Sequence, residues 1–167
     1  MRFIVTLRRM SSEELLARYA KGERDFPGAH IEGADLQGAV LAHCNLHGAR
    51  LQGADLRGAD LTESYLGSAE LQNADLTDAH LHGADLGMAD LRGAVLVRAN
   101  LEAANFSHAD LRGARLRDAV LLGADLEAAN FMRADLRGAR LHGAHTTHAR
   151  FGGADLRDID IDAQGLA

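Results

Sequence analysis

A large apolar residue falls on every fifth position of this chain from Phe26 to Ile161, with no insertion or deletion. These 28 positions hold 21 Leu, four Phe, two Ile and one polar residue, Thr146. The residue two places earlier is Ala at 24 of them. A period of five matches neither the 3.6-residue period of a helix nor the two-residue alternation of a strand. It indicates one short unit stacked many times, which is typical of a solenoid.

The unit formed by residues 34–38 illustrates the local geometry that we expect. Ala34 and Leu36 are two residues apart, so in extended backbone they share a face, and Asp35 points to the opposite side, into water. The next two residues must turn the chain, and the second of them is Gly in 13 of the 28 units. Glycine readily adopts the positive φ that a type II turn requires. Four such corners would close a coil of 20 residues, and successive coils would stack.

The A-(D/N)-L-x-x pattern resembles the pentapeptide repeat family and extends over residues 26–161. The resemblance implies an all-β fold, a right-handed quadrilateral parallel β-helix, and 28 units in groups of four predict about seven coils. Side chains 20 residues apart should then stack in columns inside the coil. Phe131 and Phe151 share a column, so we expect their rings to stack with an offset. The core residues that we single out are Leu36, Leu56, Leu76, Phe106, Phe131 and Phe151.

The first end of the coil carries the signals of a short capping helix. Ser11 and Glu14 have the spacing of a capping box, Leu15, Leu16 and Tyr19 lie on one helical face, and a glycine follows that can end the helix. No such helix is visible at the far end, which leaves open a homodimer through the C-terminal coil. The expected organisation is an N-terminal extension at 1–10, for which disorder is one alternative, a capping helix at 11–23, the repeat domain at 24–163 and a tail at 164–167.

The net charge of −6 is unevenly distributed along the chain. Residues 25–104 hold 4 basic and 12 acidic groups, whereas residues 105–163 hold 8 basic and 9 acidic groups. Direct nucleic-acid binding requires a basic stripe, so an acidic body argues against it.

The chain has no apolar run long enough for a membrane span or a signal peptide, and Met10 is an alternative start to Met1. The single cysteine, Cys44, excludes an internal disulfide and fits a reducing compartment. We therefore expect a cytoplasmic protein with no membrane partner.

Catalytic and metal-binding constellations are not evident in the sequence. Ser64 takes an inward slot without a nearby base, and a coil filled with Leu leaves no pocket. Among the nine histidines, His82 and His142 would lie three coils apart, about 14 Å at the spacing of stacked strands, which is too far for one ion. We predict no enzyme activity, catalytic residue, cofactor or metal site.

Two surface features remain as candidates for binding. Columns of Asp and Arg run side by side on one face, where they either neutralise each other or form a charged docking surface. Four aliphatic residues also stand where the pattern normally places polar side chains. Our candidate protein-binding patch consists of Val95, Val97, Val120 and Leu122.

These features favour a non-catalytic scaffold that presents rigid faces to an unidentified protein. The family resemblance implies an alternative, a DNA-mimicking modulator of a type II topoisomerase that protects gyrase. The acidic residues 25–104 fit this alternative in part, but the later coils are nearly neutral and no C-terminal dimerisation helix or interrupting loop is visible.

Overall fold

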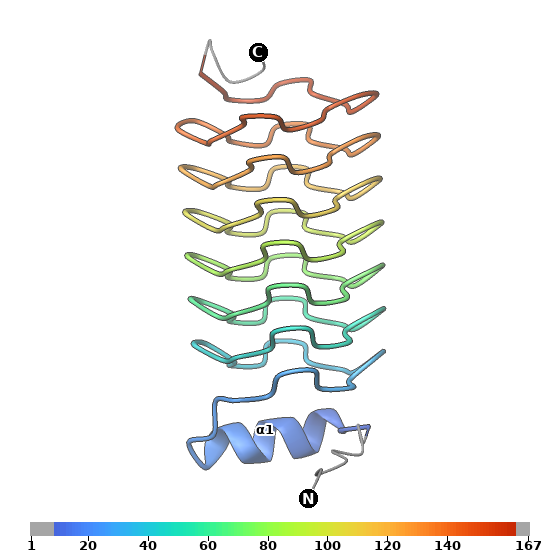
Figure 1. The fold of residues 1–167 in the computed structure, drawn as a ribbon, viewed down its shortest axis with the longest axis vertical. Helices are drawn as coiled ribbons and strands as arrows, with labels where there is room; N and C mark the ends of the chain where they lie inside the picture. Colours follow the sequence, from blue (N-terminus) through green and yellow to red (C-terminus); the bar gives the residue numbers. More distant parts are fainter. Residues whose placement is uncertain (1–8, 163–167) are drawn as a thin grey trace, which may run out of the picture.

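The chain forms a stack of coils with one helix at its N-terminal end, in a computed structural model that describes residues 9–162 (Figure 1). Twenty-four parallel bridges join residues that are 20 apart, from Asp25 with Asn45 to Arg140 with Asp160. Each bridge is an isolated pair, and no longer strand occurs in the described part of the chain. The stacked repeat is therefore present, but the all-β expectation is met only in part. Because corners take two of every five residues, the extended segments are shorter than ordinary strands.

The corners have the backbone geometry that the glycine pattern predicts. Every residue two places after an inward apolar position, from Gly28 to Asp158, has a positive φ between 52° and 73°. The N–H of the following residue bonds back across the corner, as from Ala39 to the Leu36 carbonyl at 3.0 Å. Such a hydrogen bond with a positive φ at the third residue describes a type II turn. Fourteen of these corner residues are not glycine, Met88 among them, so stacking imposes the conformation even where the residue type disfavours it.

The backbone N–H groups of a typical unit are all bonded. In the unit 55–59, the acceptors are the carbonyls of Ala34, Asp75, Thr77 and Leu56 and, for Arg57, the Oδ1 atom of Asp55 at 3.2 Å. Fourteen Asp or Asn residues bond the N–H two residues ahead in this way. The Asp or Asn of the repeat therefore completes the corner, a role that its outward direction alone does not indicate.

The core is a continuous ladder of Leu, Ala and Phe. Every large inward side chain from Phe26 to Leu141 is at most 3% exposed. Of the predicted core residues, Leu36, Leu56, Leu76, Phe106 and Phe131 lie in this buried region, and Phe151 is only partly buried. The rings of Phe131 and Phe151 are 5.2 Å apart and 7° from parallel, so they stack as their spacing predicts.

Helix α1, Ser12–Ala20, lies at the N-terminal end of the coil (Figure 1). The Oγ atom of Ser11 accepts a hydrogen bond from the Glu14 N–H at 3.1 Å, which fixes the start of the helix. Leu15 is fully buried within the hydrophobic core, and Tyr19 donates a hydrogen bond to the Ala42 carbonyl at 3.3 Å. The helix is shorter than the predicted 11–23, because Gly22 takes a φ of 92°. Residues 1–8 of the predicted extension and the whole predicted tail lie outside the described residues.

Candidate interaction surfaces

The two side chains that could act as nucleophiles inside the coil are unsuited to catalysis. Cys44 is fully buried, and burial raises the pKa of its thiol to about 11, so the thiolate is scarce at neutral pH. Ser64 is 1% exposed, and its Oγ atom has no hydrogen-bond partner among the described residues. A buried thiol with a raised pKa and a buried hydroxyl without a hydrogen-bond partner in the described chain both lack the activation that a nucleophile requires.

The described part of the chain contains neither a cluster of metal ligands nor a helix that could span a membrane. Within residues 9–162, no three His, Cys, Asp or Glu side chains are grouped so that they could hold a metal ion. The Nδ1 atom of His142 instead lies 2.7 Å from Asp162 Oδ1. α1 has nine residues, and no helix in the described range has the length and apolar character of a membrane span.

The acidic and basic columns pair with each other. Arg137 donates from Nε to Asp135 Oδ1 at 2.8 Å, and the same Nε lies 3.6 Å from Asp155 of the next coil. Hydrogen bonds from Arg157 lower the pKa of Asp155 to about 2. Arg57 on the same side binds Asp55 in this way. On other sides of the coil, Arg92 and Arg112 bind the Asp two residues before them, and Arg98 binds Asp78 of the previous coil. This pairing supports mutual neutralisation of the columns over a charged docking surface.

The candidate aliphatic patch is divided by a corner. Val95 and Val97 occupy one side, and Val120 and Leu122 lie on the next side, one coil further along. All four side chains are partly buried. Arg98 forms the corner between the two pairs and is exposed. The structure thus presents two small aliphatic pairs flanking a charged side chain.

Three more exposed apolar side chains were missed by the sequence reasoning. Val40, Tyr65 and Met88 are 55%, 58% and 68% exposed. Val40 and Tyr65 stand in the slot before the inward residue, where Asp or Asn is usual, and Met88 stands in a corner slot. The same departure from the pattern that marks Val95 could have identified them if every outward column had been compared.

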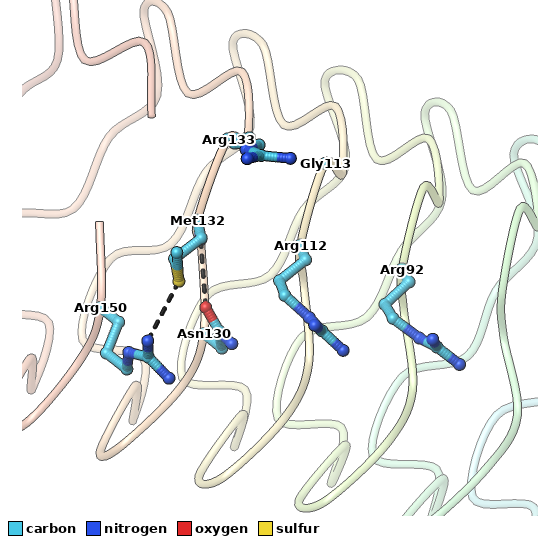
Figure 2. Close-up of a pocket in the computed structure, with 7 residues that line it drawn as sticks. All are labelled: Arg92, Arg112, Gly113, Asn130, Met132, Arg133 and Arg150. Carbon is cyan, nitrogen blue, oxygen red and sulfur yellow. Dashed lines mark hydrogen bonds between the residues drawn. The ribbon is translucent and has the colours of Figure 1, made fainter. Parts of the chain in front are cut away.

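A hollow of about 550 Å³ opens on a different side of the coil, towards its C-terminal end (Figure 2). Four arginines lie around it, together with one methionine and one asparagine. The residues that line it are Arg92, Arg112, Gly113, Asn130, Met132, Arg133 and Arg150. The sequence signal was a change within one column, in which Asp90 and Asp110 are followed by Asn130 and Arg150.

Comparison with known proteins identifies the repeat. The family model described as pentapeptide repeats matches residues 25–62, 59–96, 94–133 and 134–161, in 8 copies. None of the curated proteins matches the chain in sequence.

Similar folds occur among solved structures. A pentapeptide repeat protein, Rfr23 from the cyanobacterium Cyanothece 51142, is 35% identical over 56% of this chain, with a TM-score of 0.55, and the match spans 64% of that protein. HetL from the cyanobacterium Nostoc sp. strain PCC 7120, a pentapeptide repeat protein involved in heterocyst differentiation regulation, is 28% identical. That match covers 91% of this chain and 95% of HetL, with a TM-score of 0.56.

Proposed function

The chain belongs to the pentapeptide repeat family, and on that premise we propose that it is a non-catalytic scaffold whose rigid faces bind another protein. Proteins of this family are generally non-enzymatic scaffolds. The observation that carries the proposal is the bonding of the repeat unit. Backbone and Asp or Asn hydrogen bonds satisfy every N–H of a typical unit, so outward side chains stand in fixed columns. A preorganised surface loses little conformational entropy when a partner binds.

The partner is expected to contact the aliphatic pairs. Val97 and Leu122 stand in slots that hold Thr77, His82 and Glu102 in other coils, so nothing in the repeat requires an apolar residue there. Apolar side chains on an otherwise polar face gain free energy when a partner removes them from water. The relative HetL, of similar length, is involved in regulation, which fits a binding role.

Affinity capture with matched variants tests this scaffold. The wild-type chain should retain a specific protein from a host lysate, and the double variant Val97→Asp with Leu122→Asp should lose it. The control is Thr77→Asp with His82→Asp, which places the same charges in the same two columns at other coils. If the variant with Val97→Asp and Leu122→Asp still retains the specific protein, the aliphatic pairs are not the interface. If the wild type retains no specific protein, the scaffold proposal is wrong.

We assign the stack to a right-handed quadrilateral β-helix of about seven coils, with α1 as the cap of its first coil. The 20-residue bridge spacing and the full burial of Leu15 support this assignment. A crystal structure with a left-handed coil, or with α1 detached from the coil, would contradict it.

The last coil is proposed to join two copies of the chain. Phe151, Leu156 and Ile161 are partly buried side chains that a second copy could cover. Light scattering after size-exclusion chromatography should give the mass of a dimer, and a clean monomer would exclude this contact.

The protein is also proposed to be cytoplasmic. Recovery of the protein from a membrane or secreted fraction would contradict this assignment.

Topoisomerase modulation remains the alternative function. The acidic residues 25–104 favour it, whereas arginine pairing neutralises much of the charge further along the coil. A gyrase supercoiling assay, with and without a quinolone, separates the two functions. Protection of gyrase by the purified chain would favour the alternative, and no effect would exclude it.

A further inference from the structure

Two arginines at the hollow in Figure 2 have no carboxylate partner among the described residues. Arg133 makes no ion pair or hydrogen bond there, and the polar contact of Arg150 is with the Sδ atom of Met132 at 3.2 Å. In contrast, Arg92 and Arg112 are each held by an Asp two residues earlier, with Nε–Oδ1 distances of 2.8 and 2.9 Å. The hollow therefore combines paired and unpaired guanidinium groups.

The unpaired charge has a cause in the neighbouring columns. One column reads Asp90, Asp110, Asn130 and Arg150 in successive coils, and the column beside it reads Arg92, Arg112, Met132 and Gly152. The two earlier coils thus carry Asp–Arg pairs, whereas the two later coils lose the carboxylate and gain Arg150. The charge along this side changes from balanced to positive within one coil spacing.

The corner beside these columns also changes at one coil. Arg133 occupies a corner with glycine at the equivalent position in the coils before and after it, Gly113 and Gly153. A Cβ atom at Gly113 would meet nothing within 4 Å, so the space at this corner is open. Asn130 accepts a hydrogen bond from the Met132 N–H at 3.2 Å through Oδ1, and its amide nitrogen has no acceptor in the described part of the chain.

We propose that this hollow binds acidic side chains of a protein partner. The inference rests on the proposed scaffold function and names the chemistry of the segment that the scaffold recognises. Arg133 and Arg150 offer planar, fully charged donors that suit a carboxylate, and the free amide of Asn130 adds a neutral donor. Met132 supplies an apolar contact for the methylene groups of Asp or Glu. The volume of about 550 Å³ lies in the range of pockets that hold a drug-sized ligand or a few side chains.

The surroundings favour an acidic protein segment over nucleic acid. A nucleic-acid backbone extends along many phosphates and requires a continuous basic stripe. Here the basic region spans a few coils, and residues 25–104 on the side towards the N-terminus carry 12 acidic groups against 4 basic ones. A long polyanion would be repelled outside the hollow, whereas a short acidic segment ends within it.

Fluorescence anisotropy with a short fluorescein-labelled peptide rich in Glu tests the proposal on the full chain. A peptide with Gln in place of each Glu is the ligand control. The double variant Arg133→Glu with Arg150→Glu should bind the Glu peptide at least about tenfold more weakly, because two charge-assisted contacts become repulsive. The protein control is Arg98→Glu with Arg140→Glu, which makes the same charge change in the same two slots of the unit, on another side of the coil. At about 0.15 M salt, where the Debye length is about 8 Å, it should bind within about twofold of the wild type, because its changed charges lie on other sides of the coil and are screened. Circular dichroism verifies that both variants are folded.

Several results would overturn the proposal. They are no binding of the Glu peptide at low salt, equal binding of the Gln peptide, or equal weakening by the two double variants. Displacement of the peptide by inorganic phosphate or duplex DNA at the peptide's own concentration would assign the hollow to a phosphate ligand. If the double variant Arg133→Glu with Arg150→Glu has a lower native mass than the wild type, the hollow binds a second copy of the chain. The capture experiment with Val97 and Leu122 tests the scaffold proposal independently. Its outcome does not depend on whether the hollow binds the Glu peptide.

Discussion

The interior of the coil, residues 26–141, and the last coil, residues 142–161, share one repeat but differ in burial. Corner residues keep a positive φ in both regions, as Gly138 and Gly153 illustrate with 68° and 71°. Large inward side chains are at most 3% exposed in the interior, whereas Phe151 and Leu156 are only partly buried. The repeat therefore determines the turn at each corner. How much an inward Leu contributes to stability depends on whether another layer of the fold packs against it. At the first end of the coil, Leu15 of α1 is fully buried in the core cluster.

The largest expected effect is the loss of an interior leucine. Leu96→Ala should lower the free energy of unfolding by about 3 kcal/mol, because it removes buried methyl groups and leaves a cavity. Leu156→Ala makes the same chemical change in the last coil and should cost about 1 kcal/mol, because that side chain remains partly in water. Urea unfolding of both variants measures the difference, and equal losses would remove the distinction between the two regions.

The next effect concerns α1, at the first end of the coil. Leu15→Ala should cost about 2 kcal/mol, because Leu15 is fully buried in the core cluster. Leu16→Ala is the matched control, since it changes the same residue type in the same helix at a partly buried position, and it should cost about 1 kcal/mol. Urea midpoints give both values. If Leu15→Ala costs no more than its control, α1 does not stabilise the first coil through this side chain.

A smaller gain is expected inside the interior itself. Ser64 takes the slot that Ala holds in 24 of 28 units, and its buried hydroxyl has no hydrogen-bond partner among the described residues. Ser64→Ala should therefore raise the free energy of unfolding by about 1 kcal/mol. Ser107→Ala, in an outward slot, should change it by less than about 0.5 kcal/mol. A loss of stability in the first variant, measured by urea unfolding, would mean that the interior accommodates this hydroxyl.

The smallest effect should be shared by the two regions. Hydrogen bonds from Arg57 and Arg157 lower the pKa values of Asp55 and Asp155, and each pair forms within one unit. A lowered folded-state pKa adds stability that is present above the unfolded value near 3.9 and is lost as the pH falls towards the folded value, about 2 for Asp155. The melting temperature should thus decline between about pH 4 and pH 2.

Asn substitution tests whether these pairs act alike. Asn keeps the acceptor for the backbone N–H and removes the charge, so Asp55→Asn and Asp155→Asn should each slightly reduce the acid-dependent fall in melting temperature. A much larger effect in the interior than in the last coil would show that these pairs depend on the coils around them.

Much of the fold could be predicted from the period of five. The stacking of Phe131 on Phe151, the corner geometry and the helix start at Ser11 all follow from spacing and residue type. The role of Asp55 as the acceptor for the Arg57 N–H was not predicted, because alternation says only that the side chain points outward. Single bridges in place of strands were not predicted either, although a corner of two residues in every five leaves too little extended chain for a longer strand.

The interaction surfaces were predictable only in part. Val95 stands out because it breaks a column that can be read from the sequence, yet the exposure of Tyr65 and Met88 was missed in columns that could be read equally well. The arginine hollow required more than residue positions. Whether Arg133 or Arg92 has a carboxylate partner depends on side-chain directions and distances between coils.

The sequence by itself determined the repeating unit, the 20-residue coil and the residues that point inward, because these follow from local backbone geometry repeated without interruption. Only the tertiary structure decided which inward residues are fully buried and which arginines remain unpaired. Burial depends on neighbours about 20 residues away, which differ between the interior, the first end and the last coil, and ion pairing depends on the directions of side chains that are two or 20 residues apart.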